Sequence, residues 1–222
     1  MRDWLTYRLS DFLLFSARTY FRMFELYHRD VWPAQVAGLL VAALIVVVLV
    51  RPVKHRHRIL AFALAAVWLW VGVAFHIRRY ASINWAATYF GALFVAQAAL
   101  LALSGLRGGR ARVAGVSSPT DQRAGIAFVG AVLLVPLVGA LADRSSRQVE
   151  IFGLTPDATA IATIALLAFK QGGGRTLLIL PVVWCTIGAA TLWALSSREA
   201  WLSIAAVLVG LLALLRGRPQ AV

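Results

Sequence analysis

The chain has 222 residues, of which 61% are hydrophobic and only 14% are charged, whereas soluble domains carry roughly a quarter of charged residues. This composition excludes an ordinary soluble domain and indicates a protein of the lipid bilayer. A formal net charge of +13 would suggest a nucleic-acid partner in a soluble protein. Here the basic residues cluster in short loops between apolar runs, where membrane orientation selects them, so we expect no nucleic-acid partner.

The N-terminal segment, residues 1–31, predicts an amphipathic helix that lies in the membrane interface. Its polar residues recur at helical spacing, and phenylalanines and leucines occupy the rest of the circumference. These polar residues are Asp11, Arg18, Arg22, Glu25 and Arg29. Ser10 or Asp11 is the expected N-cap. Two interpretations stay open: the helix is a membrane-lying anchor, or its stretch from Phe12 to Arg29 docks a membrane-protein partner.

Residues 32–222 form the second predicted unit, a transmembrane helical domain. Apolar runs of about 16 to 24 residues match the length that a helix needs to cross about 30 Å of hydrocarbon. Seven candidate spans are Trp32 to Val50, Ile59 to Ile77, Ile83 to Leu106, Ala124 to Ala142, Ile151 to Phe169, Thr176 to Leu195, and Ala200 to Leu215. The fifth has a polar first turn and the seventh is short, so the prediction is an all-α polytopic transmembrane helix bundle of six to seven spans.

The loops between these spans differ in basic content, which predicts the orientation of the chain. Loops 51–58, 106–123, 170–175 and 216–222 hold twelve Lys and Arg, whereas loops 78–82, 143–150 and 196–200 hold five. Basic loops stay in the cytoplasm. We therefore expect the N-terminus outside and the C-terminus in the cytoplasm.

A proline and an acid stand at the start of the fifth span, in the sequence Thr155-Pro156-Asp157. A threonine N-cap, a proline at the first helical position and an acid in the first turn together cap a helix. Thr159 and Thr163 continue this polarity inward at helical spacing. That polar face predicts either hydrogen-bonded packing between helices or a path for a solute.

Other polar residues lie at the same predicted outer level, and amides among them need partners inside the hydrocarbon. We therefore predict a polar outer vestibule that binds a ligand. Its candidate residues are Asn84, Thr88, Gln97, Asp157, Thr159 and Gln35. Asp157 is the candidate cation-sensitive or proton-sensitive group.

Sequence signatures of catalysis and cofactor binding are not found. His28 and His76 lack the local spacing of metal ligands, and no Walker loop, HExxH or GxSxG motif occurs. No nucleophile and base stand together. We predict no catalytic residue, no cofactor and no metal site, and expect that the protein is not an enzyme.

Four stretches resemble a family of bacterial multi-pass membrane proteins known only as a domain of unknown function. They read DFLLFSARTYFRMFELYHRDVWPAQ (11–35), INWAATYFGALFVAQ (83–97), FGLTPDATAIAT (152–163) and PVVWCTIGAATLWAL (181–195). The resemblance covers nearly the whole chain and implies a helical bundle in a bacterial inner (plasma) membrane. It implies no activity and no site residues.

Two functions follow from these patterns. The first is a small permease or channel-like protein that uses the polar outer vestibule. The alternative is a non-catalytic accessory or assembly subunit of a larger membrane complex, docked through the N-terminal helix, in which Asp157 only caps its helix.

Overall fold

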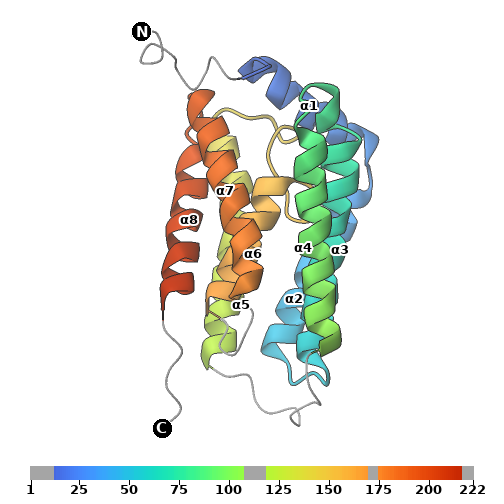
Figure 1. Cartoon of the computed structure of the whole chain (residues 1–222), viewed down its shortest axis with the longest axis vertical. Helices are drawn as coiled ribbons and strands as arrows, with labels where there is room; N and C mark the ends of the chain where they lie inside the picture. Colours follow the sequence, from blue (N-terminus) through green and yellow to red (C-terminus); the bar gives the residue numbers. More distant parts are fainter. Residues whose placement is uncertain (1–12, 108–118, 170–174, 217–222) are drawn as a thin grey trace.

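A computed structural model describes residues 13–107, 119–169 and 175–216, and these residues form a helical bundle without strands (Figure 1). Between α3 and α4 a π-helical segment, Val71–Ile77, and a short 3-10 turn, Tyr80–Ser82, interrupt the α-helical geometry. The α-helices are α1 (Ala17–Asp30), α2 (Ala34–Val50), α3 (Arg56–Trp70), α4 (Ala87–Arg107), α5 (Pro119–Leu141), α6 (Pro156–Phe169), α7 (Thr176–Ala194) and α8 (Ala200–Leu215).

Within the described residues, four helical stretches are long and apolar enough to cross a membrane: Arg56–Ser82, α4, α5 and α7. A fifth is added if α1 and α2, which meet at a bend of 88°, are counted as one broken span. The helices α6 and α8 are apolar but shorter. Large side chains such as Leu40, Leu133 and Leu212 are exposed on the bundle surface, as lipid-facing residues are. The all-α fold is therefore confirmed, with four to five long apolar stretches as candidate membrane spans where the sequence predicts six to seven.

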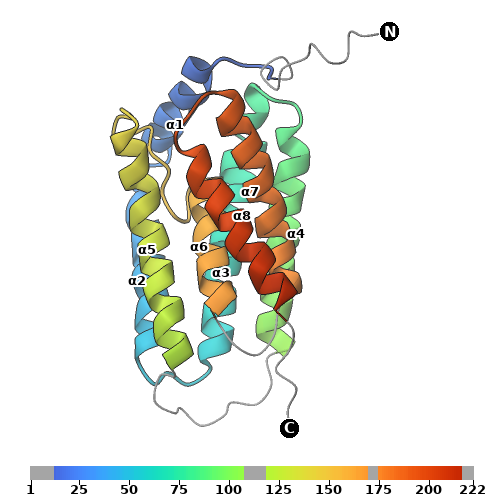
Figure 2. The same ribbon diagram turned by 90° about the vertical axis from the view of Figure 1, so that its left-hand side faces the viewer.

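Helix α1 lies across one end of the bundle (Figures 1 and 2). Its N-cap is Ser16, whose Oγ accepts a hydrogen bond from the Thr19 backbone N–H at 3.2 Å. The predicted caps Ser10 and Asp11 lie outside the described residues. The helix is amphipathic as the sequence predicts, but its aromatic residues Phe21, Phe24 and Tyr27 are buried against the rest of the chain.

The fifth predicted span is wrong in its first five residues. The helix begins at Pro156 and not at Ile151, because residues 151–155 form turns. Its 14 residues cover about 21 Å at 1.5 Å per residue, short of about 30 Å of hydrocarbon. Figure 1 shows α6 beginning part-way along the bundle, after the connection from α5 has descended between the helices.

The irregular connection is accommodated because α2 carries a glycine where it passes. A Cβ on Gly38 would lie 2.8 Å from the Phe152 carbonyl oxygen and 2.7 Å from a Leu154 methyl group. Non-helical backbone is tolerated at membrane depth only where protein surrounds it. Helix α6 then packs against α3, α5, α7 and α8, so it occupies the centre of the bundle.

Candidate functional site

The N-terminus of α6 is capped by a residue far outside the predicted motif. The Glu150 Oε2 atom accepts hydrogen bonds from the backbone N–H groups of Asp157 at 2.9 Å and Ala158 at 3.2 Å. The Thr155 hydroxyl instead bonds within its own turn, to the N–H and C=O of Ile151. The prediction of Thr155 as the cap is therefore wrong, while Pro156 does take the first helical position.

The Asp157 side chain leaves its own helix end and turns toward α7 and α8. Its Oδ1 accepts a hydrogen bond from Trp184 Nε1 at 2.7 Å, and its Oδ2 accepts one from Ser203 Oγ at 3.2 Å. Only 3% of Asp157 is exposed. A Cβ on Gly188 would lie 2.7 Å from both carboxylate oxygens, so α7 needs glycine there for this approach. We call Glu150, Asp157, Trp184, Gly188 and Ser203 the acidic centre.

The acidic centre contains two buried carboxyl groups without a counterion. Among the described residues neither Glu150 nor Asp157 forms a salt bridge. Arg144 forms its ion pair with Glu199, at 3.4 Å, and not with either of these two carboxyl groups. Two ionised carboxylates in a low-dielectric interior repel each other and lose hydration, so the centre favours a bound proton or a bound cation.

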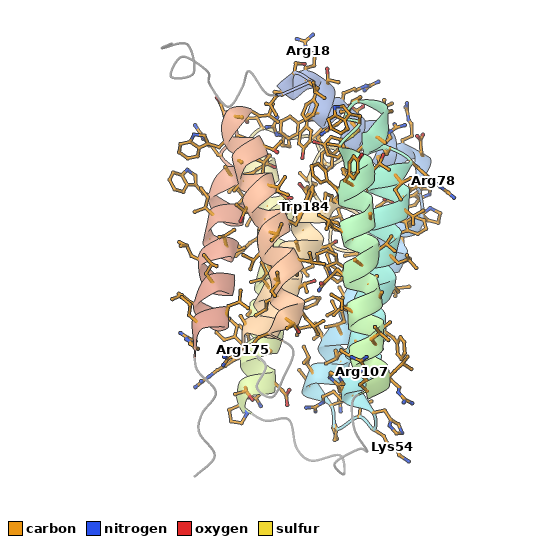
Figure 3. All side chains as sticks on the ribbon, in the orientation of Figure 1. Arg18, Lys54, Arg78, Arg107, Arg175 and Trp184 are labelled. Atoms are coloured by element: carbon orange, nitrogen blue, oxygen red, sulfur yellow. The ribbon has the colours of Figure 1, made fainter. Side chains whose placement is uncertain are left out.

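A buried histidine also packs against the ring of Trp184. His76 belongs to the π-helical segment and is fully buried. Its ring centroid lies 4.7 Å from that of Trp184 and 4.5 Å from that of Phe94. Neither ring nitrogen of His76 has a hydrogen-bond partner in the described part of the chain. Trp184, which Figure 3 labels in the interior of the bundle, therefore contacts both an unpartnered imidazole and the carboxylate of Asp157.

The threonine face of α6 is hydrogen-bonded packing. Thr159 Oγ1 donates to the Thr155 carbonyl at 2.7 Å and accepts from the Gly153 N–H at 3.0 Å. Thr163 Oγ1 donates to the Thr159 carbonyl at 2.7 Å and accepts from Trp68 Nε1 at 3.0 Å. Both hydroxyls are fully buried and have partners, so they offer no free group to a solute.

The other predicted vestibule residues bond to separate parts of the bundle. Gln97 Nε2 donates to the Leu177 carbonyl at 2.8 Å, and Gln35 Nε2 donates to the His28 carbonyl at 2.7 Å. Asn84 Oδ1 accepts from the Ala86 N–H at 3.1 Å, and Thr88 is exposed. Among the described residues, no hydrogen bond connects these side chains to Asp157 or Thr159, so they do not share one hydrogen-bonded cluster with the acidic centre.

Sequence reasoning missed Trp184 and Ser203 as side-chain partners of Asp157, Glu150 as the cap of α6, and His76 as a neighbour of Trp184. Of these residues, only Glu150 could have been found from the sequence, because it is the acid that ends the loop before the fifth predicted span, and an acid near a helix start is a common cap.

Within the described residues, no cluster of three or more His, Cys, Asp or Glu side chains could hold a metal ion.

Comparison with known proteins gives a family and no activity. No curated protein and no solved structure matches the chain. One family model, described as a family of unknown function (DUF6064), matches residues 17–221. Because that match covers most of the chain, including the eight α-helices of the described residues, the chain belongs to this family of unknown function, DUF6064.

Proposed function

We propose that this protein is a small permease whose acidic centre binds and releases a proton as a solute crosses the membrane. One observation carries the proposal: Glu150 and Asp157 are buried together, without a salt bridge to any described residue, where a helix begins inside the bundle. Ionisable groups inside membrane proteins are costly and mark ion or proton pathways by default.

The backbone around the acidic centre supports this role. Helices that begin within the bundle, after an irregular segment, form the midplane binding sites of many transporters. α6 has this form. The π-helical turn that carries His76 is a second departure from regular helix geometry, and such turns occur often at functional sites.

The proposed location is a bacterial inner membrane with the N-terminus outside. Lys54, Arg107 and Arg175 lie at one end of the bundle, and Arg18 and Arg78 at the other (Figure 3). The loops at the first end are the ones that are richest in basic residues. Under the positive-inside rule that end faces the cytoplasm.

The alternative role, an accessory subunit docked through Phe12 to Arg29, has less support. Phe12 lies outside the described residues, and the aromatic residues of α1 are buried in the chain's own bundle. Asp157 bonds to α7 and α8 and does not cap α6, so the structural role assigned to it in that alternative is also unsupported.

Proton-coupled flux in proteoliposomes tests the permease. Purified protein is reconstituted with pyranine inside, and amino acids, sugars, organic acids and organic cations are added one class at a time. We expect at least one class to change the internal pH, and Asp157→Asn to slow that change by about tenfold or more, which is at least 1.4 kcal/mol of barrier. Asparagine keeps the shape and the acceptor for Trp184 but cannot exchange a proton.

Asp143→Asn is the matched control, because it removes an exposed carboxylate at a positive φ that asparagine tolerates. This variant should keep the wild-type rate. The proposal is refuted if no solute class moves protons in the wild-type protein, or if Asp157→Asn and Asp143→Asn give equal rates.

A further inference from the structure

A pocket of about 540 Å³ lies at the end of the bundle that α1 crosses, and its lining includes no residue of the acidic centre, although Ile151 directly follows Glu150. Three segments form it: the end of α1, the turn into α2 and the connection between α5 and α6. Its lining residues are His28, Arg29, Trp32, Gln35, Ser146, Arg147 and Ile151. This volume falls in the range of small-molecule sites.

Hydrogen bonds fix the inner wall and leave two acceptors unpaired. His28 Nδ1 lies 2.9 Å from the Arg147 carbonyl, which can only accept, so Nδ1 carries the proton. Burial lowers the pKa of His28, although the bond to the Arg147 carbonyl opposes the shift. With the proton on Nδ1, the neutral form of the ring presents Nε2 as an acceptor. Among the described residues, neither His28 Nε2 nor Gln35 Oε1 has a hydrogen-bond partner, and His28 is only 4% exposed.

The outer wall carries positive charge. Arg29 and Arg147 are exposed, and neither forms a salt bridge within the described residues. On α1, Glu25 pairs with Arg22 at 2.6 Å and Asp30 pairs with Arg79 at 3.2 Å, and the charge of Arg147 also acts on Glu25. Guanidinium groups match the geometry of phosphate oxygens, so this wall favours a phosphate.

The pocket adjoins an apolar surface. Leu39 follows Gln35 by one helical turn on the same face of α2, and its side chain is 56% exposed. Trp32, which lines the pocket, is 69% exposed. Tryptophan is enriched at the boundary between headgroups and hydrocarbon, so the pocket is placed to receive the headgroup of a lipid whose chains lie on α2.

We propose that this pocket binds a phosphate ester that carries hydroxyl groups, independently of the permease function. The phosphate lies against Arg29 and Arg147, and the hydroxyls donate to His28 Nε2 and Gln35 Oε1. A phosphatidylglycerol headgroup and free glycerol phosphate share this chemistry. Both the arginines and the two acceptors are needed to select this ligand. The arginines alone would bind any anion, and the two acceptors alone would bind any hydrogen-bond donor.

Native mass spectrometry of the full-length protein tests the proposal. The probes are phosphatidylglycerol and phosphatidylmethanol, which carry the same charge but differ in headgroup hydroxyls, and phosphatidylcholine as the zwitterionic reference. We expect phosphatidylglycerol to bind best. The double variant Arg29→Gln/Arg147→Gln should weaken its binding by about tenfold or more, since it removes both guanidinium groups proposed to lie against the phosphate.

Arg18→Gln/Arg78→Gln is the matched control, because it removes two exposed charges from the same end of the bundle but none from the pocket (Figure 3). Gln35→Leu should abolish the preference for phosphatidylglycerol over phosphatidylmethanol while leaving the binding of phosphatidylmethanol unchanged.

Calorimetry with free glycerol phosphate distinguishes a soluble phosphate ester from a lipid headgroup as the ligand. If the free ester binds and the double variant abolishes that binding, the ligand is soluble. If it does not bind, the ligand is the lipid.

Two results would overturn the assignment. Equal binding of phosphatidylglycerol and phosphatidylmethanol by the wild-type protein would show that the pocket does not recognise the headgroup hydroxyls. Equal losses in the two double variants would show that only the net charge of this end matters.

Discussion

Asp157 and Trp184 hold two distant parts of the chain together through one buried hydrogen bond of 2.7 Å. An indole N–H can only donate, and a carboxylate oxygen buried in apolar surroundings needs a donor, so each satisfies the other. Ser203 supplies the second donor, from α8. A carboxylate persists in this apolar run because three helices meet on it, and their contacts give it partners that solvent would otherwise provide.

Removing the indole donor should therefore destabilise the bundle. We expect Trp184→Phe to lower the free energy of unfolding by about 1.5–3 kcal/mol, since it leaves a buried acceptor without its donor. Thermal unfolding in detergent measures this change. Trp193→Phe is the control, because Trp193 is 53% exposed and packs edge-on against Trp201. A loss for Trp184→Phe no larger than that for Trp193→Phe would contradict the role given to this bond.

Helix α6 is the element on which the arrangement depends. It is too short to span the bilayer alone, yet it packs against four other helices, and the segment before it brings Glu150 to its N-terminus. Small residues permit these approaches: Gly38 faces the connection to α6, and Gly188 faces the Asp157 carboxylate. Close helix contacts of this kind are typical of membrane bundles, where small residues replace hydrophobic driving force.

A methyl group at Gly188 should therefore disturb the acidic centre. We expect Gly188→Ala to cost about 1–3 kcal/mol, as overpacking does, because the new Cβ would meet both Asp157 oxygens at 2.7 Å. Gly130→Ala is the matched change on α5, where no atom lies within 4 Å of the new Cβ. It should stabilise the helix by about 0.5–1 kcal/mol. Melting temperatures that move in the same direction in both variants would refute this account.

At the scale of the whole molecule, charge differs between the two ends of the bundle. One end carries the basic residues of loop 51–58 with Arg107 and Arg175, whereas the other combines arginines with acids, as in the pairs of Arg79 with Asp30 and Arg144 with Glu199. Figures 1 and 2 show the long helices running between these ends. The difference sets the proposed orientation.

Labelling of single cysteines in intact cells tests this orientation. Ser145 and Lys54 are exposed at opposite ends, and the native Cys185 is fully buried, so it contributes little background. We expect an impermeant maleimide to label Ser145→Cys in intact cells and Lys54→Cys only after permeabilisation. The reverse pattern would show that the orientation is opposite to the proposed one. Equal labelling of both variants in intact cells would contradict a bundle whose two ends lie on opposite sides of one membrane.

Most of the secondary structure could be predicted from the sequence, through its hydropathy and its prolines at helix starts. The predicted spans that begin at Trp32, Ala124 and Thr176 correspond to α2, α5 and α7, which begin at Ala34, Pro119 and Thr176. The reason is local, because an apolar run of this length in lipid must satisfy its backbone within one helix. Pro156 likewise marked a helix start by its fixed φ.

Tertiary structure alone decided which polar groups meet. From the sequence, Asp157 was grouped with Asn84 and Gln97 by its predicted depth, yet its partners are Trp184 and Ser203, 27 and 46 residues away along the chain. The cap of α6 comes from Glu150, because the connection before the helix folds into the bundle and does not continue the span. Depth follows from local hydropathy, but the direction of a side chain follows from which helices pack together, and that depends on contacts between distant residues.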